Sequence, residues 1–260
     1  MMCPLILSAC GGPCPYTVSE ESFHSDGKQI FAELYRPDVS RKVPLVIFSH
    51  GFGATFQSGK SYAEALAPLG YAVCCFDFCG GSPMSRSEGS TTEMSLFSEA
   101  RDLKAVMDQL LEKDFIDPER VILMGESQGG MVSAMVAAER EESIERLLLI
   151  YPAFCIKNDW VTKYPTVEDM PEEVDLWGMK LSRTYLEGLY DLNIAGIMGQ
   201  YEGPVAIFHG DQDQVVALSY SEEALKAYKN ATLTVLPGEG HGFSPAGAAQ
   251  TIDAIKELLR

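Results

Sequence analysis

The stretch Gly125-Glu126-Ser127-Gln128-Gly129 decides the fold of this chain of 260 residues. It follows the apolar, strand-like run Val121-Ile122-Leu123-Met124 and precedes a run of small and apolar residues with helical character over 130–138. The two glycines let backbone segments pass close to each other, which a Cβ atom would prevent. The sequence therefore predicts a tight strand–turn–helix unit. Its tip carries Ser127 at a helix N-terminus, where free N–H groups favour developing negative charge.

Two later motifs place an acid and a base downstream of this turn. The predicted strand Pro204-Val205-Ala206-Ile207-Phe208 is followed by Asp213, and the predicted strand Thr232-Leu233-Thr234-Val235-Leu236 is followed by His241. Open α/β sheets build their sites at the carboxyl ends of strands. A serine hydroxyl needs a base, an imidazole can take its proton, and a carboxylate can hold that imidazole. Ser127, Asp213 and His241 are therefore the predicted catalytic residues.

The chain resembles the serine α/β-hydrolases from about residue 23 to residue 260, and it is most similar to the small bacterial feruloyl (cinnamoyl) esterases. The motifs that carry this resemblance are His50-Gly51-Phe52-Gly53, Gly125-Glu126-Ser127-Gln128-Gly129-Gly130, His209-Gly210-Asp211-Gln212-Asp213 and Leu176-Trp177-Gly178. The resemblance implies a single α/β-hydrolase domain over residues 1–260, a mostly parallel sheet and ester hydrolysis.

Asp211 and Asp213 compete for the role of the triad acid. The superfamily's usual Asp-x-x-Val pattern is matched by Asp213-Gln214-Val215-Val216, although Ala217 stands where the family usually has proline. We therefore expect Asp213 to face His241. Asp211 is expected to hold the loop through backbone hydrogen bonds, as aspartate commonly does in turns.

The tetrahedral intermediate of acyl transfer needs preorganised donors for its oxyanion. In this fold one donor is the N–H of the residue after the nucleophile, here Gln128, and the other comes from the loop after an early strand. The predicted strand Leu45-Val46-Ile47-Phe48 leads into that loop, so Phe52 is the expected second donor. His50 and His209 are expected to be structural, and His24 to lie on the surface.

Strands alternate with helices along the rest of the chain, which predicts right-handed crossovers in one sheet. A β-hairpin is expected near 16–35, further strands at 73–76 and 147–150, and helices near 58–69, 94–113 and 246–259. The interval 153–202 breaks the alternation and is rich in aromatic residues and methionine. We interpret it as a lid over Ser127, as the resemblance also implies. Trp160, Trp177 and Tyr185 are the candidates for contact with substrate; the alternative is that such residues form the core of the lid itself or a dimer contact.

The formal net charge of −17 argues against nucleic acid and anionic membrane surfaces as partners. No run of about 18 apolar residues exists, so no membrane span is expected. No cysteine, histidine or acidic cluster has metal-ligand spacing, so neither a metal nor another cofactor is expected. A homodimer is plausible from the family resemblance.

The seven cysteines suggest a reducing compartment, because the count is odd and Cys74 and Cys75 are adjacent within a predicted core strand. Leu7-Ser8-Ala9-Cys10 resembles a lipoprotein cleavage box, but the segment before it is short and has no basic residue. We expect a cytoplasmic protein, with export or lipid anchoring through Cys10 as the alternative.

The sequence thus predicts a serine carboxylesterase, and the family resemblance implies that it acts on hydroxycinnamoyl or similar small aromatic acyl esters. The alternatives within the same chemistry are a general short-chain acyl esterase, a thioesterase and a lipid esterase. The alternative from another class is a non-catalytic binding protein on a hydrolase fold, since fold alone does not fix function.

Overall fold

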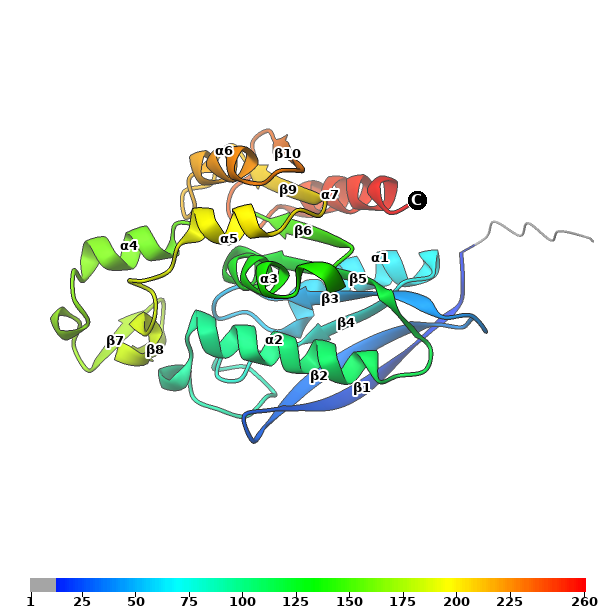
Figure 1. The fold of residues 1–260 in the computed structure, drawn as a ribbon, viewed down its shortest axis with the longest axis horizontal. Helices are drawn as coiled ribbons and strands as arrows, with labels where there is room; N and C mark the ends of the chain where they lie inside the picture. Colours follow the sequence, from blue (N-terminus) through cyan, green and yellow to red (C-terminus); the bar gives the residue numbers. More distant parts are fainter. Residues whose placement is uncertain (1–12) are drawn as a thin grey trace, which may run out of the picture.

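The structure, a computed structural model, describes residues 13–260. Within this range an eight-stranded sheet lies at the centre, in the order β1-β2-β4-β3-β5-β6-β9-β10 (Figure 1). Its strands are β1 Tyr16–Ser25, β2 Lys28–Pro37, β3 Val43–Ser49, β4 Ala72–Phe76, β5 Ile116–Glu126, β6 Arg146–Ile150, β9 Val205–Gly210 and β10 Ala231–Leu236. β2 pairs antiparallel with β1 and with β4, and the remaining neighbours are parallel. The predicted α/β class is confirmed.

Helices cover both faces of this sheet. Along β3, Leu45 and Ile47 belong to the apolar core shared with α2, α3 and α6, whereas Val46 and Phe48 belong to the core shared with α1 and α7. Successive side chains of a strand point to opposite faces, so the two cores lie on either side of the sheet. The helices are α1 Lys60–Leu66, α2 Leu96–Leu111, α3 Ser127–Glu139, α6 Leu218–Ala227 and α7 Pro245–Leu258.

The N-terminal hairpin forms as predicted. β1 and β2 meet in a two-residue turn in which Asp26 and Gly27 have φ angles of 49° and 77°. Such a turn matches the twist of the paired strands and favours aspartate followed by glycine. His24 is exposed, as expected. The lipoprotein-like segment at Cys10 lies outside the described residues.

The helix expected near 58–69 is shorter than the sequence suggested. Only α1 is α-helical, and it is flanked by the 3₁₀ turns η1 Phe56–Gly59 and η2 Ala67–Leu69. Pro68 lacks the backbone N–H that would continue the α-helical bonding pattern, which accounts for the change at the C-terminal end. The long helix near 94–113 forms as α2, with Ser95 at its N-cap accepting a hydrogen bond from the Ser98 N–H.

The interval between β6 and β9 has secondary structure of its own and projects beside α3 (Figure 1). It contains α4 Ile156–Lys163, the hairpin of β7 Glu173–Leu176 and β8 Met179–Ser182, and α5 Ile194–Gln200. Short 3₁₀ turns, η5 Val167–Asp169 and η6 Arg183–Leu186, connect them. Buried residues of this interval, including Trp160, Tyr185 and Tyr201, join the apolar core of α2 and α3. We call residues 153–202 the insert.

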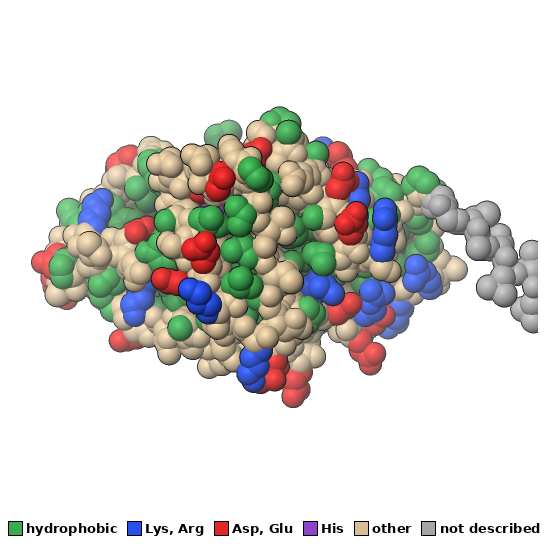
Figure 2. Space-filling model, turned by 90° about the horizontal axis from the view of Figure 1, so that it is seen from above, with side chains coloured by type: hydrophobic (Ala, Val, Ile, Leu, Met, Phe, Trp, Pro, Cys, Tyr) green, Lys and Arg blue, Asp and Glu red, His purple; other side chains and the backbone are tan. Residues whose placement is uncertain are grey.

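The acidic charge is not gathered into one block on the face drawn in Figure 2, where acidic and basic side chains are interspersed. Cys74 and Cys75 are fully buried in β4, and burial raises the pKa of both thiols, so they pack as small apolar residues as predicted. Within residues 13–260, no helix has the length and apolar character needed to cross a membrane.

Candidate active site

Ser127, His241 and Asp213 meet just past the carboxyl ends of β5, β10 and β9. The His241 Nε2 atom lies 2.9 Å from Ser127 Oγ, and its Nδ1 atom lies 2.8 Å from Asp213 Oδ2. A carboxylate only accepts hydrogen bonds, so Nδ1 carries the hydrogen and Nε2 is left to accept from the serine hydroxyl. This is the geometry that general-base activation of a serine requires.

Ser127 is held in a backbone conformation that L-residues seldom adopt, with φ of 50°. The surrounding backbone is too close for other side chains: a Cβ at Gly129 would lie 2.2 Å from the Ser49 carbonyl oxygen, and one at Gly125 would lie 2.3 Å from the Gly129 carbonyl oxygen. The glycines quoted from the sequence are thus needed for close approach between β3, β5 and α3. The turn places Ser127 as the first residue of α3.

Asp213, and not Asp211, faces His241. Its Oδ1 atom accepts hydrogen bonds from the N–H groups of Val215 and Val216, both at 2.8 Å. Burial alone would raise the pKa of Asp213, but hydrogen bonds from His209, His241 and these two N–H groups outweigh it and hold the pKa below its usual range. Asp211 accepts from the Gly238 N–H at 2.7 Å, which is the loop-holding role expected for it.

The two expected oxyanion donors, Phe52 and Gln128, line the same cavity as Ser127. Gly51 N–H donates to Glu126 and Gly53 N–H donates to the Gly81 carbonyl, whereas the Phe52 N–H between them donates to no group among residues 13–260. The Gln128 N–H is in the first turn of α3, where backbone donors have no intrahelical partner. Both N–H groups are therefore free to receive a ligand oxygen.

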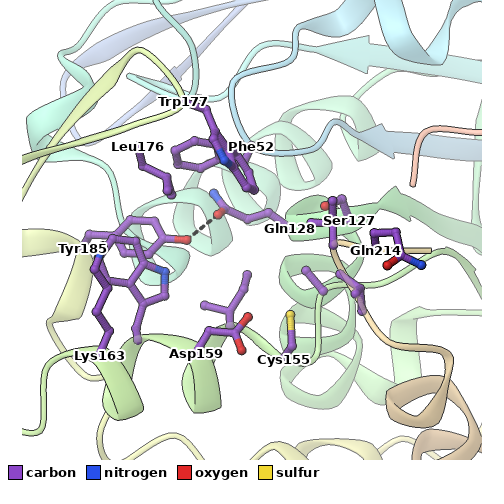
Figure 3. Close-up of a pocket in the computed structure, with 15 residues that line it drawn as sticks. Phe52, Ser127, Gln128, Cys155, Asp159, Lys163, Leu176, Trp177, Tyr185 and Gln214 are labelled. Atoms are coloured by element: carbon purple, nitrogen blue, oxygen red, sulfur yellow. Dashed lines mark hydrogen bonds between the residues drawn. The ribbon is translucent and has the colours of Figure 1, made fainter. Parts of the chain in front are cut away.

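A cavity of about 310 Å³ opens beside Ser127, between the core and the insert (Figure 3). Its walls include all three insert residues predicted to contact substrate, Trp160, Trp177 and Tyr185. Trp160 and Tyr185 are buried, whereas Trp177 is 73 % exposed at the tip of the β7–β8 hairpin and lies edge-on to Phe52, with 5.8 Å between the ring centroids. The volume is at the lower end of the range typical of small-molecule sites.

The side chain of Gln128 connects this cavity to the core. Its Oε1 atom accepts from the Tyr185 hydroxyl at 2.6 Å, and its Nε2 atom donates to Glu99 on α2 at 2.8 Å (Figure 3 draws the first bond). Burial raises the pKa of Glu99 to about 8, more than the bond from Gln128 lowers it. A neutral carboxyl group is therefore buried next to the candidate oxyanion donor at neutral pH.

Comparison with known proteins places this geometry in a family. A family model described as serine aminopeptidase, S33, matches residues 40–184, more than half of the chain. The chain belongs to the S33 family of serine hydrolases.

Several solved and curated proteins are similar to this S33-family chain. The structure of Est1E from Butyrivibrio proteoclasticus with ferulic acid bound is 28 % identical, covers 92 % of this chain and 97 % of that chain, and has a TM-score of 0.84. The quorum-quenching protein AidA of Acinetobacter baumannii is 31 % identical over 118 residues, which are 45 % of this chain and 38 % of the relative. Mouse monoglyceride lipase is 31 % identical over 139 residues, 53 % of this chain and 44 % of the relative. The matches thus span less than half the length of these two curated relatives.

His50, in the loop that follows β3, has a structural role in this S33-family hydrolase. His50 is buried, its Nε2 atom accepts from the Phe78 N–H at 3.1 Å, and its Nδ1 atom lies 2.8 Å from the Gly51 carbonyl oxygen. Burial lowers its pKa. Among residues 13–260, no group of three or more histidine, cysteine or acidic side chains could hold a metal ion.

Sequence reasoning missed several residues of the S33-family site. Asp159 and Lys163 of α4 line the cavity, and so do Cys155 and the segment 214–216. Tyr151 packs on His241 with 4.7 Å between ring centroids, and its hydroxyl donates to Glu126 at 3.0 Å. For α4, the only signal in the sequence that could have indicated these residues is the four-residue spacing of Asp159 and Lys163, which places both on one side of a helix. For Tyr151 the sequence offers none, because the contact depends on its φ of 35°.

Proposed function

We propose that this protein is a serine carboxylesterase in which Ser127 is the nucleophile, His241 the general base and Asp213 the residue that orients His241. The observation that carries the proposal is the continuous pair of hydrogen bonds from Ser127 through His241 to Asp213, anchored on a strained turn. Backbone strain of this kind costs about 1–3 kcal/mol, persists only where the surrounding structure imposes it, and clusters at active sites.

The geometry supports a two-stage reaction. Ser127 Oγ attacks the ester carbonyl while its proton passes to His241 Nε2, and the N–H groups of Phe52 and Gln128 hold the oxyanion. The tetrahedral intermediate then expels the alcohol, which takes the proton from His241. Water next attacks the acyl-enzyme and gives a proton to His241. Collapse of the second intermediate releases the carboxylic acid and returns that proton to Ser127.

The acyl group that fits best is a hydroxycinnamoyl or similar small aromatic one. Phe52, Trp160, Trp177 and Tyr185 give the cavity flat apolar walls, and Asp159 adds a polar group that a phenolic hydroxyl could reach. The bound ferulic acid in the Est1E relative supports the same class. In this proposal the insert acts as the lid that forms the acyl pocket.

The test is kcat/KM on methyl ferulate, p-nitrophenyl butyrate, a long-chain p-nitrophenyl ester and a short acyl-thioester. We expect a preference for the ferulate ester, abolished in Ser127→Ala. Asp213→Asn should reduce kcat by roughly 10⁴-fold because the histidine loses its orienting acceptor. Asp211→Asn, the matched control two residues away, should retain activity.

Two outcomes would contradict parts of this proposal. Full activity in Ser127→Ala would remove the esterase mechanism. Turnover of butyrate without ferulate, lost in Ser127→Ala, would keep the mechanism and remove the aromatic acyl assignment together with the lid interpretation.

A further inference from the structure

His209 is buried directly behind the triad acid. It is the penultimate residue of β9, and its side chain is fully enclosed. Its Nε2 atom lies 3.2 Å from Asp213 Oδ2 and 3.0 Å from the Val216 carbonyl oxygen, while its Nδ1 atom lies 2.7 Å from Ser221 Oγ on α6. Each ring nitrogen therefore has a defined partner, and one of them is the carboxylate that faces His241.

These partners fix where the hydrogen of His209 lies. A carboxylate and a carbonyl oxygen only accept hydrogen bonds, so Nε2 must carry the hydrogen. In the neutral ring Nδ1 is then an acceptor, and the hydroxyl of Ser221 can donate to it. Buried polar groups are costly without partners, and the Ser221 hydroxyl satisfies Nδ1 in the tautomer that Asp213 and Val216 select.

The carboxylate of Asp213 thus receives hydrogen bonds on both oxygens. Oδ2 accepts from His241 and lies 3.2 Å from His209 Nε2, which shares its one hydrogen with the Val216 carbonyl, and Oδ1 accepts from the N–H groups of Val215 and Val216. We propose that His209, oriented by Ser221, is a positioning residue that fixes the rotation of Asp213 and withdraws part of its charge from His241. This inference rests on the proposed function, because it assigns a role in the same serine mechanism.

The other titratable groups near Asp213 do not account for a shift of the pH profile in the variants proposed below. Tyr151, which follows β6, and Cys155, which precedes α4, both lie within the electrostatic influence of Asp213, and burial raises the pKa of each. They stay uncharged between pH 5 and pH 8. Glu126, at the end of β5, is bonded to Tyr151 and is unchanged in every variant proposed below.

The test is the pH profile of kcat/KM for methyl ferulate, or for whichever ester the protein hydrolyses best. In His209→Leu the carboxylate loses one donor and directs more charge towards His241, which favours the imidazolium. The acid limb of the profile should therefore move to higher pH by about half a unit or more. The plateau should fall roughly tenfold, the effect of losing one hydrogen bond to a charged group.

Conservative variants separate positioning from a merely structural role. His209→Gln keeps an N–H donor near the position of Nε2, so the acid limb should return towards that of the unaltered protein. Ser221→Ala removes the partner of Nδ1 and should shift the limb in the same direction as His209→Leu, but less. Ser133→Ala removes another buried serine hydroxyl, one without a hydrogen-bond partner among residues 13–260, and should leave the limb in place.

An unmoved acid limb in folded His209→Leu, with or without a lower plateau, would overturn the inference, and so would equal shifts in His209→Leu and His209→Gln. If His209→Leu does not fold, an unmoved limb in Ser221→Ala overturns it instead. Loss of activity in Ser127→Ala alongside any of these results leaves the proposed esterase function standing, whereas full activity in Ser127→Ala removes both.

Discussion

At the scale of single residues, the proposed chemistry depends on the strained backbone conformation of Ser127. Ser127 keeps a φ of 50° because β5 and α3 fix the chain on both sides of it, and Gly125 and Gly129 let the strands and the helix approach. The strain and the exposed hydroxyl come from the same turn. Stability and activity are therefore opposed at this one position.

The variant Ser127→Gly should separate the effect of this residue on stability from its effect on activity. Glycine adopts positive φ without the steric penalty of a Cβ, so we expect this variant to be more stable than Ser127→Ala by about 1 kcal/mol. Both variants lack the nucleophile and should be inactive. Urea denaturation of the two proteins measures the difference, and Ser127→Ala is the matched control because it also lacks the hydroxyl. Equal stabilities would contradict a strain at Ser127 larger than the entropic cost of ordering a glycine there.

At the scale of elements, the sequence predicted those parts whose signals are local. The turn around Ser127 and the strands that precede Asp213 and His241 follow from short apolar runs ending in glycine-rich loops, and parallel strands bring such ends to one edge. The interior of the insert gave no clear period, so α4, α5 and the β7–β8 hairpin were not predicted individually. Trp160 and Tyr185 were candidates by residue type alone, but their neighbours Gln128 and Glu99 come from distant segments. The contact of His209 with Asp213 was missed although the two residues are only four apart, because it depends on how the loop after β9 turns back onto that strand.

One of the contacts between the insert and the core involves Gln128, the residue that follows the nucleophile. Tyr185 bonds to Gln128, and on the hairpin side the Thr91 hydroxyl donates to the Lys180 carbonyl at 2.6 Å. The first of these contacts lies in the wall of the cavity. We therefore expect the wall of the acyl pocket to depend on it.

Tyr185→Phe should lower kcat/KM for methyl ferulate by about tenfold and affect p-nitrophenyl acetate little. The variant leaves the buried Gln128 oxygen without a donor, at a cost of about 1–3 kcal/mol, in a wall that only a large acyl group reaches. Tyr190→Phe is the matched control, because it loses a similar bond within the insert, from its hydroxyl to the Tyr164 carbonyl at 2.7 Å, and does not line the cavity. Equal losses on both esters would contradict a role in the acyl pocket.

At the scale of the whole molecule, the net charge of −17 and the buried carboxyl groups link stability to pH. Glu99 is the clearest case, because burial raises its pKa from 4.5 to about 8 and repulsion from Asp102 adds to the rise. Between these two values the folded protein keeps a proton that the unfolded chain has released. The free energy of unfolding therefore falls as pH rises through this window and stays lower above it.

Glu99→Gln should remove this part of the pH dependence while keeping an acceptor for Gln128. We expect the variant and the unaltered protein to be similarly stable near pH 5, and the variant to be more stable near pH 9 by a few kcal/mol at most, since each pKa unit is worth about 1.4 kcal/mol. Urea denaturation across this range measures the difference. Glu222→Gln removes the same charge from an exposed position on α6 and should follow the unaltered protein. Parallel pH curves for Glu99→Gln and the unaltered protein would show that Glu99 does not carry a proton in the folded state at neutral pH.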